Sequence, residues 1–258
     1  MSILRISRHI KKPIYFKINM RIISHMTANS PKICVSLAPY SLHELTILAA
    51  KAIKQEADFV EIRFDYMPIS DIKKAATELS SMDLCNKAIF TLRSRSEGGN
   101  FMDSSSERVK ILEMLGLSNP MLLDVEFNTL KGNKSLMNFI QRNKIRPLVS
   151  WHNFLKTPTK SVILSKILQM RKYSRFIKVV TKANKLEDSF NMLSLYDDIR
   201  NTSLVAFAMG ELGVLSRILC TIYGNAPFTY ASLNKTIAPG QMPICMVRKL
   251  YDVIFRKV

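Results

Sequence analysis

Short runs of β-branched, aromatic and other apolar residues alternate with longer amphipathic segments from about residue 31 to the C-terminus. Each run is bounded by polar or turn-forming residues, the pattern of a buried strand in a parallel sheet. The runs predict eight strands, over 32–38, 59–66, 87–94, 121–127, 146–154, 175–183, 204–210 and 228–233.

The segments between these runs repeat apolar residues three and four positions apart, the spacing of a helix with one buried face. Capping boxes begin two of the helices, at Ser41 and at Ser104, and the second is expected to end at Gly116. Five further helices fit 70–81, 133–143, 159–172, 213–224 and 243–256. The helix that begins at Asn184 is expected to bury three apolar side chains on one face: Leu186, Phe190 and Leu193.

Strands that alternate with helices predict an α/β fold with a parallel sheet. Eight strands and eight helices in one chain of this length are typical of a (β/α)8 TIM barrel, which we expect over residues 31–258 as a single domain. A doubly wound open sheet is the alternative. It is disfavoured because no G-x-G-x-x-G follows the first strand and no Walker A lysine motif occurs.

Residues 1–30 differ from the rest of the chain because they carry six basic residues and no acidic one. We expect a basic N-terminal extension with little local structure, and a tether to nucleic acid or to a membrane surface is the alternative interpretation. The segment has neither the apolar core nor the cleavage site of a secretory signal. Met20 and Met26 are alternative start sites.

Composition narrows the class of protein further. Hydrophobic residues make up 47% of the chain and charged residues 22%, so a disordered or low-complexity protein is excluded. No apolar run is long enough to cross a bilayer. The four cysteines and four histidines have no metal-ligand or disulfide-framework spacing, so we expect reduced thiols in the cytoplasm and no metal site.

Ionisable residues within the predicted strands need an explanation, because parallel strands are usually apolar on both faces. Side chains two positions apart share a face of a strand, and in a barrel that face meets the axis near the end where active sites form. Burying so many charges without partners or a ligand costs several kcal/mol each. The residues on shared faces are Glu61, Arg63 and Asp65, then Thr91, Arg93 and Arg95, then Ser150 and His152, then Lys178 and Lys182.

A lysine in such a pocket predicts a specific chemistry. Desolvation and the neighbouring Arg63 and Arg93 would lower the pKa of the amine, and a neutral amine can form a Schiff base with a ketone. His152 could then act as the general base beside the imine, so no cofactor is needed. Position alone leaves Lys178 and Lys182 as candidates for the nucleophile.

Six motifs between residue 32 and the C-terminus make the chain resemble the type I 3-dehydroquinate dehydratases, shikimate-pathway enzymes. The motifs are Val60–Asp65, Thr91–Ser94 with Glu97–Gly99, Ser150–Phe154 with Lys156–Pro158, Phe176–Val179, Ala208–Gly210 with Arg217, and Ala238–Gln241.

The resemblance implies a TIM-barrel hydro-lyase that converts 3-dehydroquinate to 3-dehydroshikimate and water, without a cofactor and commonly as a homodimer. It implies that Lys178 forms the imine, that His152 moves protons and that Glu97 orients His152. It further implies that the anionic substrate and its hydroxyl groups are held by Glu61, Arg63, Arg93, Arg217 and Gln241.

One position departs from the family pattern. A serine often stands directly before Ala-Pro-Gly-Gln, but here the residue is Ile237. A backbone group or Ser232 would have to supply the missing hydrogen bond.

Two other functions are weighed against this one. A Schiff-base aldolase on the same barrel would share the buried lysine and the arginines. A net charge of +18 also suits a nucleic-acid-binding protein, although no helix-turn-helix, RRM or zinc-finger signature is present. The same positive charge would attract an anionic substrate.

Overall fold

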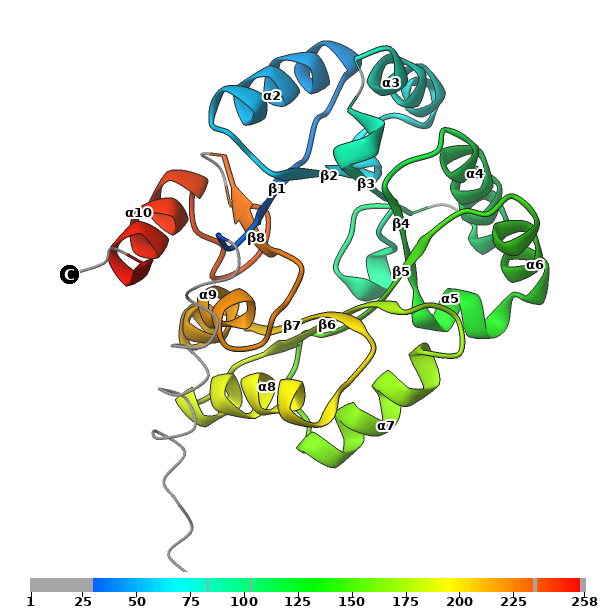
Figure 1. The fold of residues 1–258 in the computed structure, drawn as a ribbon. Coiled ribbons are helices and arrows are strands. Elements are labelled where there is room, and N and C mark those ends of the chain that lie inside the picture. The colour runs from blue at the N-terminus through cyan, green and yellow to red at the C-terminus, as the bar shows by residue number, and fades with distance from the viewer. Residues whose placement is uncertain (1–29, 83, 103, 234–235, 256–258) are drawn as a thin grey trace, which may run out of the picture.

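The structure is a computed structural model that describes residues 30–82, 84–102, 104–233 and 236–255. The predicted extension therefore lies outside the described residues except for Ser30. Within the described chain, parallel strands form one eight-stranded sheet in the order β7-β6-β5-β4-β3-β2-β1-β8, which curls around a central axis (Figure 1). The strands are β1 Ile33–Leu37, β2 Phe59–Arg63, β3 Ala88–Thr91, β4 Leu122–Glu126, β5 Pro147–Asn153, β6 Phe176–Lys182, β7 Ser203–Met209 and β8 Thr229–Ser232.

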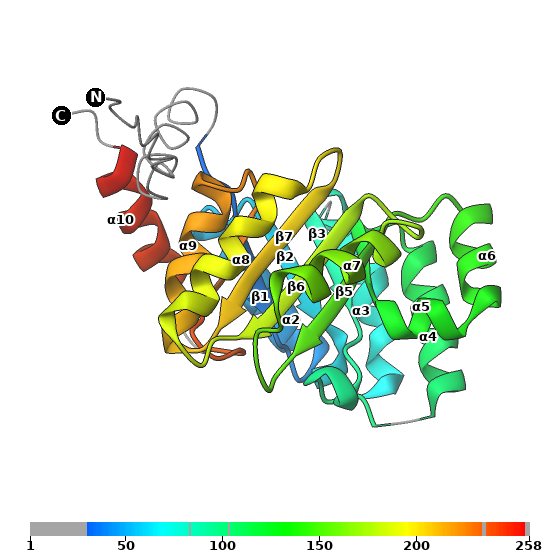
Figure 2. The ribbon, with the colours of Figure 1, turned by 90° about the horizontal axis from the view of Figure 1, so that it is seen from below.

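Helices surround this ring on its outer side, and Figure 2 shows α7 and α8 lying across the outer face of β5, β6 and β7. Of the described helices, none is long and apolar enough to cross a membrane. Their bounds are α2 Leu42–Lys54, α3 Ile69–Ser81, α4 Ser105–Leu117, α5 Phe127–Gly132, α6 Lys134–Arg142, α7 Lys160–Met170, α8 Leu186–Asp198, α9 Val214–Ile222 and α10 Ile244–Phe255.

The predicted (β/α)8 barrel is confirmed, and all eight predicted strands occur at the expected places with somewhat shorter bounds. The ring has one seam, because no ladder joins β7 to β8 among the described residues. Across it, the rings of Phe207 in β7 and Tyr230 in β8 lie 6.3 Å apart. Helix α9 holds β8 from outside, where the hydroxyl of Thr229 donates to the carbonyl of Arg217 at 2.6 Å.

The predicted capping boxes show how local sequence begins a helix. The side chain of Ser41 accepts a hydrogen bond from the backbone N–H of Glu44 at 3.2 Å, and Ser104 accepts one from Glu107 at 3.2 Å. Such a bond satisfies one of the amide groups left unpaired in the first turn. The carboxylate of Glu44 accepts from the N–H of Tyr40 at 2.7 Å, one residue before the cap.

The prediction for α8 was wrong in its start and in its buried face. The helix begins at Leu186 because the Asp188 carboxylate accepts from the backbone N–H groups of Asn184 and Lys185 at 2.8 and 3.2 Å. Leu186 and Phe190 are 47% and 37% exposed, whereas the helix packs through the side that includes Met192, Leu193 and Tyr196. α5 was not predicted, since its six residues are too few to show a helical period.

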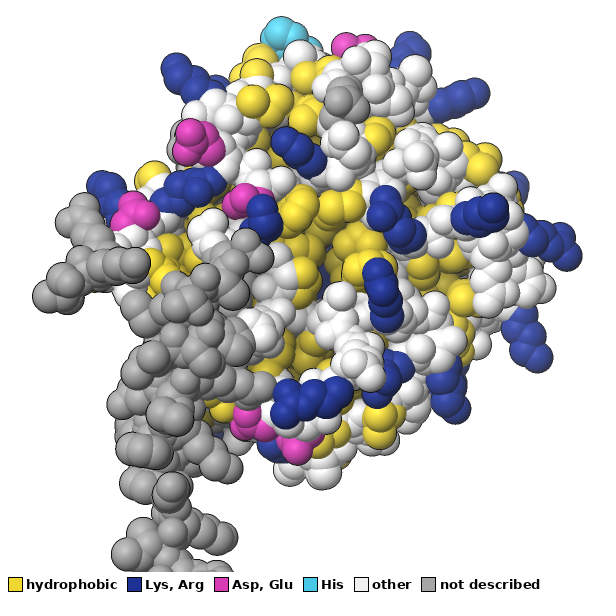
Figure 3. Space-filling view, in the orientation of Figure 1, with side chains coloured by type: hydrophobic (Ala, Val, Ile, Leu, Met, Phe, Trp, Pro, Cys, Tyr) yellow, Lys and Arg dark blue, Asp and Glu magenta, His cyan; other side chains and the backbone are white. Residues whose placement is uncertain are grey.

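The surface agrees with the basic composition. On the face shown in Figure 3, Lys and Arg side chains are spread over the whole described surface and Asp and Glu are few. The long-range field of such a surface attracts anions without selecting among them.

Candidate active site

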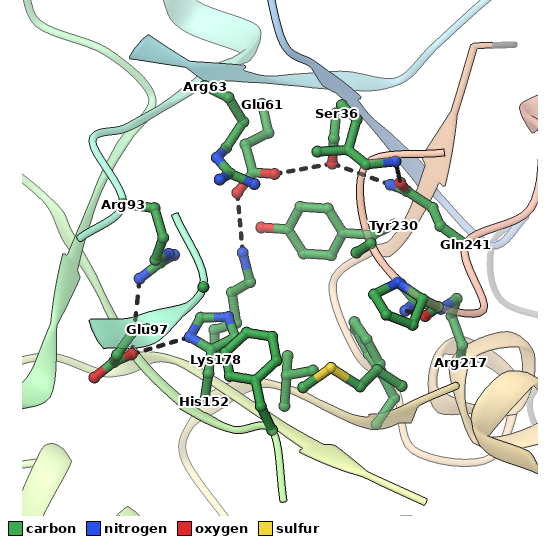
Figure 4. Close-up of a pocket in the computed structure, with 18 residues that line it drawn as sticks. Ser36, Glu61, Arg63, Arg93, Glu97, His152, Lys178, Arg217, Tyr230 and Gln241 are labelled. Carbon is green, nitrogen blue, oxygen red and sulfur yellow. Dashed lines mark hydrogen bonds and ion pairs between the residues drawn. The ribbon is translucent and has the colours of Figure 1, made fainter. Parts of the chain in front are cut away.

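A cavity of about 140 Å³ lies at the end of the barrel where the strands lead into their following loops, and all eight predicted site residues line it (Figure 4). A cavity near this size holds a six-membered ring. Segments far apart in the sequence meet here because the carboxyl ends of parallel strands face one end of a barrel. The predicted residues in its wall are Glu61, Arg63, Arg93, Glu97, His152, Lys178, Arg217 and Gln241.

Lys178 lies deep in the barrel, as the third residue of β6, and is 5% exposed. Its Nζ lies 2.9 Å from Oε1 of Glu61 and 3.3 Å from Oδ2 of Asp124. The sequence predicted cationic neighbours for this amine, but its direct partners are two carboxylates. Lys182 is exposed and does not line the cavity, whereas Lys178 does. The structure therefore distinguishes the two lysines that strand position alone left as candidates for the nucleophile.

Glu61 is fixed by hydroxyl groups from neighbouring strands as well as by Lys178. Ser36 donates to its Oε2 at 2.8 Å and Thr91 donates to its Oε1 at 3.1 Å. Burial by itself would raise the pKa of Glu61, but Lys178, Arg63 and Arg93 lower it to about 2. Glu61 is therefore ionised at neutral pH and can only accept hydrogen bonds.

His152 and Glu97 form a hydrogen-bonded pair, with Nδ1 and Oε2 3.0 Å apart. Burial and the cations of Arg93, Lys178 and Arg63 hold the pKa of His152 well below its usual range. The imidazole is thus neutral, and when Glu97 is ionised its Nδ1–H donates to the carboxylate. Nε2 then keeps a lone pair and can accept a proton.

Arg93 lies just beyond β3 and its guanidinium is held by protein groups. It donates to Asp124 and to Ser150, each at 2.7 Å, and lies 3.3 Å from Glu126. Ser150 in turn donates to Asp124 at 2.6 Å. Arg93 therefore holds Asp124, one of the two partners of Lys178, and it also lines the cavity, where the resemblance implies a substrate contact.

The sequence predicted Arg63 and Asp65 on a shared face of one strand, and this was wrong. Strand β2 ends at Arg63, and Asp65 lies in the 3₁₀ turn η1 (Phe64–Tyr66). The Asp65 carboxylate accepts two hydrogen bonds from Arg63, at 2.8 and 2.7 Å. The guanidinium also lies 5.1 Å from the ring of Tyr66. Arg95 was grouped with Arg93 in the same way, but it is exposed and outside the cavity.

Arg217, on α9, is the cation of the cavity that has the fewest protein partners. It is 2% exposed, its Nη2 donates to the carbonyl of Pro239 at 3.3 Å, and its Nε has no hydrogen-bond partner among the described residues. Burial lowers its pKa to about 10, and the guanidinium lies 4.2 Å from the ring of Phe207. A buried guanidinium with free donors is suited to binding a carboxylate.

Gln241 lies on the same side of the cavity as Arg217 (Figure 4). Its Nε2 donates to Ser36 at 3.2 Å and its Oε1 accepts from the N–H of Ile237 at 3.1 Å. Ile237 lines the cavity, but Ser232 does not. The hydroxyl that β8 contributes to the cavity is that of Tyr230.

Sequence reasoning missed two kinds of site residue. Asp124 and Glu126 stand on one face of β4, the same two-residue alternation that identified the other strands, so the signal was present. Tyr230 lies within the predicted strand 228–233, so its hydroxyl was a second such signal, a polar group on a buried strand. The described residues contain no group of three or more His, Cys, Asp or Glu side chains that could hold a metal ion.

The chain is similar to proteins of a known family. The family model for type I 3-dehydroquinase matches residues 33–258. A 3-dehydroquinate dehydratase of Dehalococcoides mccartyi is 36% identical over 207 residues, covering 78% of this chain and 89% of that protein. One from Methanothermobacter thermautotrophicus is 32% identical over 219 residues, covering 85% and 95%.

Solved structures agree. The 3-dehydroquinate dehydratase of Aquifex aeolicus superposes with a TM-score of 0.73 at 28% identity, covering 88% of this chain and all of that one (100%). The type I enzyme of Clostridium difficile gives a TM-score of 0.79 at 23% identity over 90% and 95% of the two chains, which supports the fold. With the extent of the sequence match, these likenesses show that the chain belongs to the type I 3-dehydroquinase family.

Proposed function

We propose that this cavity removes water from 3-dehydroquinate to give 3-dehydroshikimate through an imine on Lys178. The family assignment supports the overall reaction. The observation that carries the proposed steps is the buried amine of Lys178 in one cavity with the neutral imidazole of His152, which Glu97 orients (Figure 4). An aldolase and a nucleic-acid-binding protein, the alternatives suggested by the sequence, lose support because the relatives over most of the chain are dehydratases.

Substrate binding begins with charge. The substrate carries a carboxylate, and Arg217 offers it a buried guanidinium whose Nε is free. Arg63 and Gln241 line the same cavity and can hold the hydroxyl groups of the ring. This leaves Arg93 to hold Asp124 in place beside the amine.

The carboxylates beside Lys178 are compatible with imine formation. An ammonium group and a protonated imine carry the same single positive charge, so Glu61 and Asp124 can stabilise the covalent intermediate as they would the ammonium group. The amine adds to the ketone carbon after it passes a proton to a neighbouring base. The ketone oxygen then leaves as water, and the amine nitrogen remains bonded to the carbon.

Elimination follows from the electron demand of the protonated imine. Nε2 of His152 accepts a proton from the carbon next to the imine carbon, and the electron pair of that C–H bond forms the new double bond. The bond between the next ring carbon and its hydroxyl group breaks, and His152 returns the proton so that the hydroxyl leaves as water. Hydrolysis of the imine releases the conjugated enone and restores Lys178.

The direct test is an ultraviolet assay with 3-dehydroquinate, in which the conjugated enone of the product absorbs. Sodium borohydride added during turnover should reduce the imine to a stable adduct, which mass spectrometry would place on Lys178. An enone signal with no adduct on Lys178 would reject the imine mechanism but leave the overall reaction standing. Absence of both signals would reject the proposed function.

The Glu97–His152 pair predicts how turnover depends on pH. Burial raises the pKa of Glu97 to about 7, against the lowering effect of Arg93. Below that pH the protonated carboxyl donates to Nδ1, so the imidazole proton moves to Nε2 and the base is lost. The kcat should therefore fall as the pH decreases through about 7.

The control for this prediction is Glu97→Gln. Its amide oxygen can still accept from Nδ1–H, but the side chain does not titrate. The fall of kcat should move to lower pH in this variant. A pH profile of Glu97→Gln that matches the wild-type profile would show that another group causes the fall.

Replacing Arg217 by Gln should raise the KM for 3-dehydroquinate by roughly 10- to 100-fold, the value of a charge-assisted hydrogen bond. The kcat should change much less, because the carboxylate is bound equally before and during elimination. Steady-state kinetics measures both constants. Lys182→Gln removes an exposed cation as the control, and an equal rise in KM there would mean that net charge alone is responsible.

The barrel over 31–258 is proposed to carry the whole activity, because the residues that line the cavity fall between Ser36 and Gln241. The basic extension would then contribute no group to the chemistry. Homodimer formation and a cytoplasmic location stay predictions.

A further inference from the structure

Tyr230 lies beside the amine of Lys178, although the roles given above do not use it. Nζ of Lys178 lies 4.1 Å from the centre of its ring, and the side chain is 3% exposed. Phe228 packs against the ring edge-on at 5.5 Å, and Phe207 lies 6.3 Å away. Packing therefore fixes the ring, and the hydroxyl points into the cavity between Glu61 and Lys178 (Figure 4).

The hydroxyl of Tyr230 has no hydrogen-bond partner among the described residues. The hydroxyl groups of Ser36 and Thr91 donate to Glu61, and that of Ser150 donates to Asp124. The Ser232 hydroxyl also has no partner among the described residues, but Ser232 does not line the cavity. A buried hydroxyl without a partner costs roughly 1–3 kcal/mol. Because the Tyr230 hydroxyl faces the cavity, a bound ligand can accept the hydrogen bond that it lacks.

The charge state of the phenol decides what it can do there. Burial, followed by the nearby carboxylate of Glu61, raises the pKa of Tyr230 well above its usual range. The group therefore stays protonated at neutral pH. It can donate a hydrogen bond, but it is not a base.

We propose that the hydroxyl of Tyr230 donates a hydrogen bond to the ketone oxygen of the substrate while Lys178 attacks the ketone carbon. This inference rests on the imine mechanism proposed above. It assigns to Tyr230 the role of a small oxyanion site for imine formation.

The electrostatics of the cavity explain why such a donor is needed. As the amine adds, negative charge develops on the ketone oxygen, which lies about 1.2 Å from the carbon under attack. The groups nearest the amine are Glu61 and Asp124, and the ionised Glu61 repels that charge. A neutral O–H donor aimed at the same point offsets the repulsion, and preorganised donors are effective in a dry site.

The step balances without any further reactant. The amine nitrogen forms a bond to the carbon, the carbon–oxygen double bond becomes a single bond, and the oxygen takes a proton released by the nitrogen. The remaining carbon–oxygen bond then breaks, and the oxygen leaves as water with a second proton while the protonated imine forms. Ammonium and ketone thus give protonated imine and water, and Tyr230 keeps its own proton throughout.

The test is Tyr230→Phe, which removes only the hydroxyl and keeps the packing of the ring. Enzyme and saturating 3-dehydroquinate are mixed rapidly and quenched with borohydride at increasing times, and mass spectrometry follows the adduct on Lys178. The rate of adduct formation should fall roughly 10- to 100-fold, at or below the usual effect of losing one oxyanion donor. Thermal stability should be unchanged or higher, because an unpaired buried hydroxyl is removed.

Tyr251→Phe is the matched control, since it removes a buried tyrosine hydroxyl outside the cavity, one that pairs with Thr221 at 2.8 Å. Its adduct should form at the wild-type rate. If Tyr230→Phe also forms the adduct at the wild-type rate, or changes only the KM, the inference is overturned while the imine mechanism stands. If wild-type enzyme forms no adduct, the mechanism proposed for the site fails first.

Discussion

Replacing Lys178 by methionine is expected to abolish the borohydride adduct and to lower kcat with 3-dehydroquinate by about 10⁴- to 10⁶-fold, the range seen when a nucleophile is removed. Methionine has a similar length and can fill the buried space, but it has no amine to bond to the ketone. Without the imine, only the ketone is left to make the neighbouring C–H acidic, and a neutral ketone withdraws electrons less strongly than a protonated imine. The ultraviolet assay and the mass of the reduced protein measure the two effects separately.

Folding must be checked in this variant, because the change leaves Glu61 and Asp124 without a cation at the place where Nζ was. Both carboxylates keep other donors, from Ser36 and Thr91 to Glu61 and from Arg93 to Asp124. We therefore expect a folded protein with a lower melting temperature.

Lys182→Met is the matched control for this experiment, since that lysine stands on the same strand but is exposed. It should retain the adduct and normal turnover. If Lys182→Met loses the adduct while Lys178→Met retains it, the nucleophile has been assigned to the wrong lysine.

Replacing His152 by alanine is expected to separate the two halves of the reaction. The imine should still form, because Lys178, Glu61 and Asp124 are untouched, so borohydride should still trap an adduct. Proton transfer should fail, and kcat should drop by roughly 10²- to 10⁴-fold, the contribution of a positioned acid–base group. The trapped species should keep the mass of the substrate adduct, one water molecule heavier than the product adduct.

His43→Ala serves as the comparison, because His43 lies at the exposed start of α2, away from the cavity. Near-normal turnover in His152→Ala would assign the base to another group. A loss of the adduct in that variant would mean that His152 is needed already for imine formation.

Most of the site could be predicted because one simple rule covers it. Ionisable side chains on buried strands are rare, and their two-residue alternation indicates which of them face the axis. Glu61, His152 and Lys178 satisfy that rule and line the cavity. Asp124 and Glu126 satisfy it as well, so the alternation in strand four carries the same signal.

Other features could not be derived from local pattern. The strands end earlier than the apolar runs, so Asp65 lies in a turn, where its carboxylate binds Arg63. For the same reason Arg95 lies beyond its strand and is exposed. The prediction of the buried face of α8 was wrong. Leu186 and Phe190 have a helical spacing, but they lie on the side of the helix that does not pack against the barrel. Apolar spacing shows that a helix has a buried side, but the neighbouring element decides which side it is.

The order of strands and helices, the barrel and the residue types of the site were determined by the sequence alone, since hydrophobic period and family motifs are local properties of the chain. The partners of Lys178, the crowding of Arg93 and the free hydroxyl of Tyr230 were decided only by the tertiary structure. These features arise because the sheet curls into a barrel, which brings strands β2, β4, β6 and β8 to one axis. Distances between side chains of different strands, and hence their charge states and vacant hydrogen bonds, exist only after that closure.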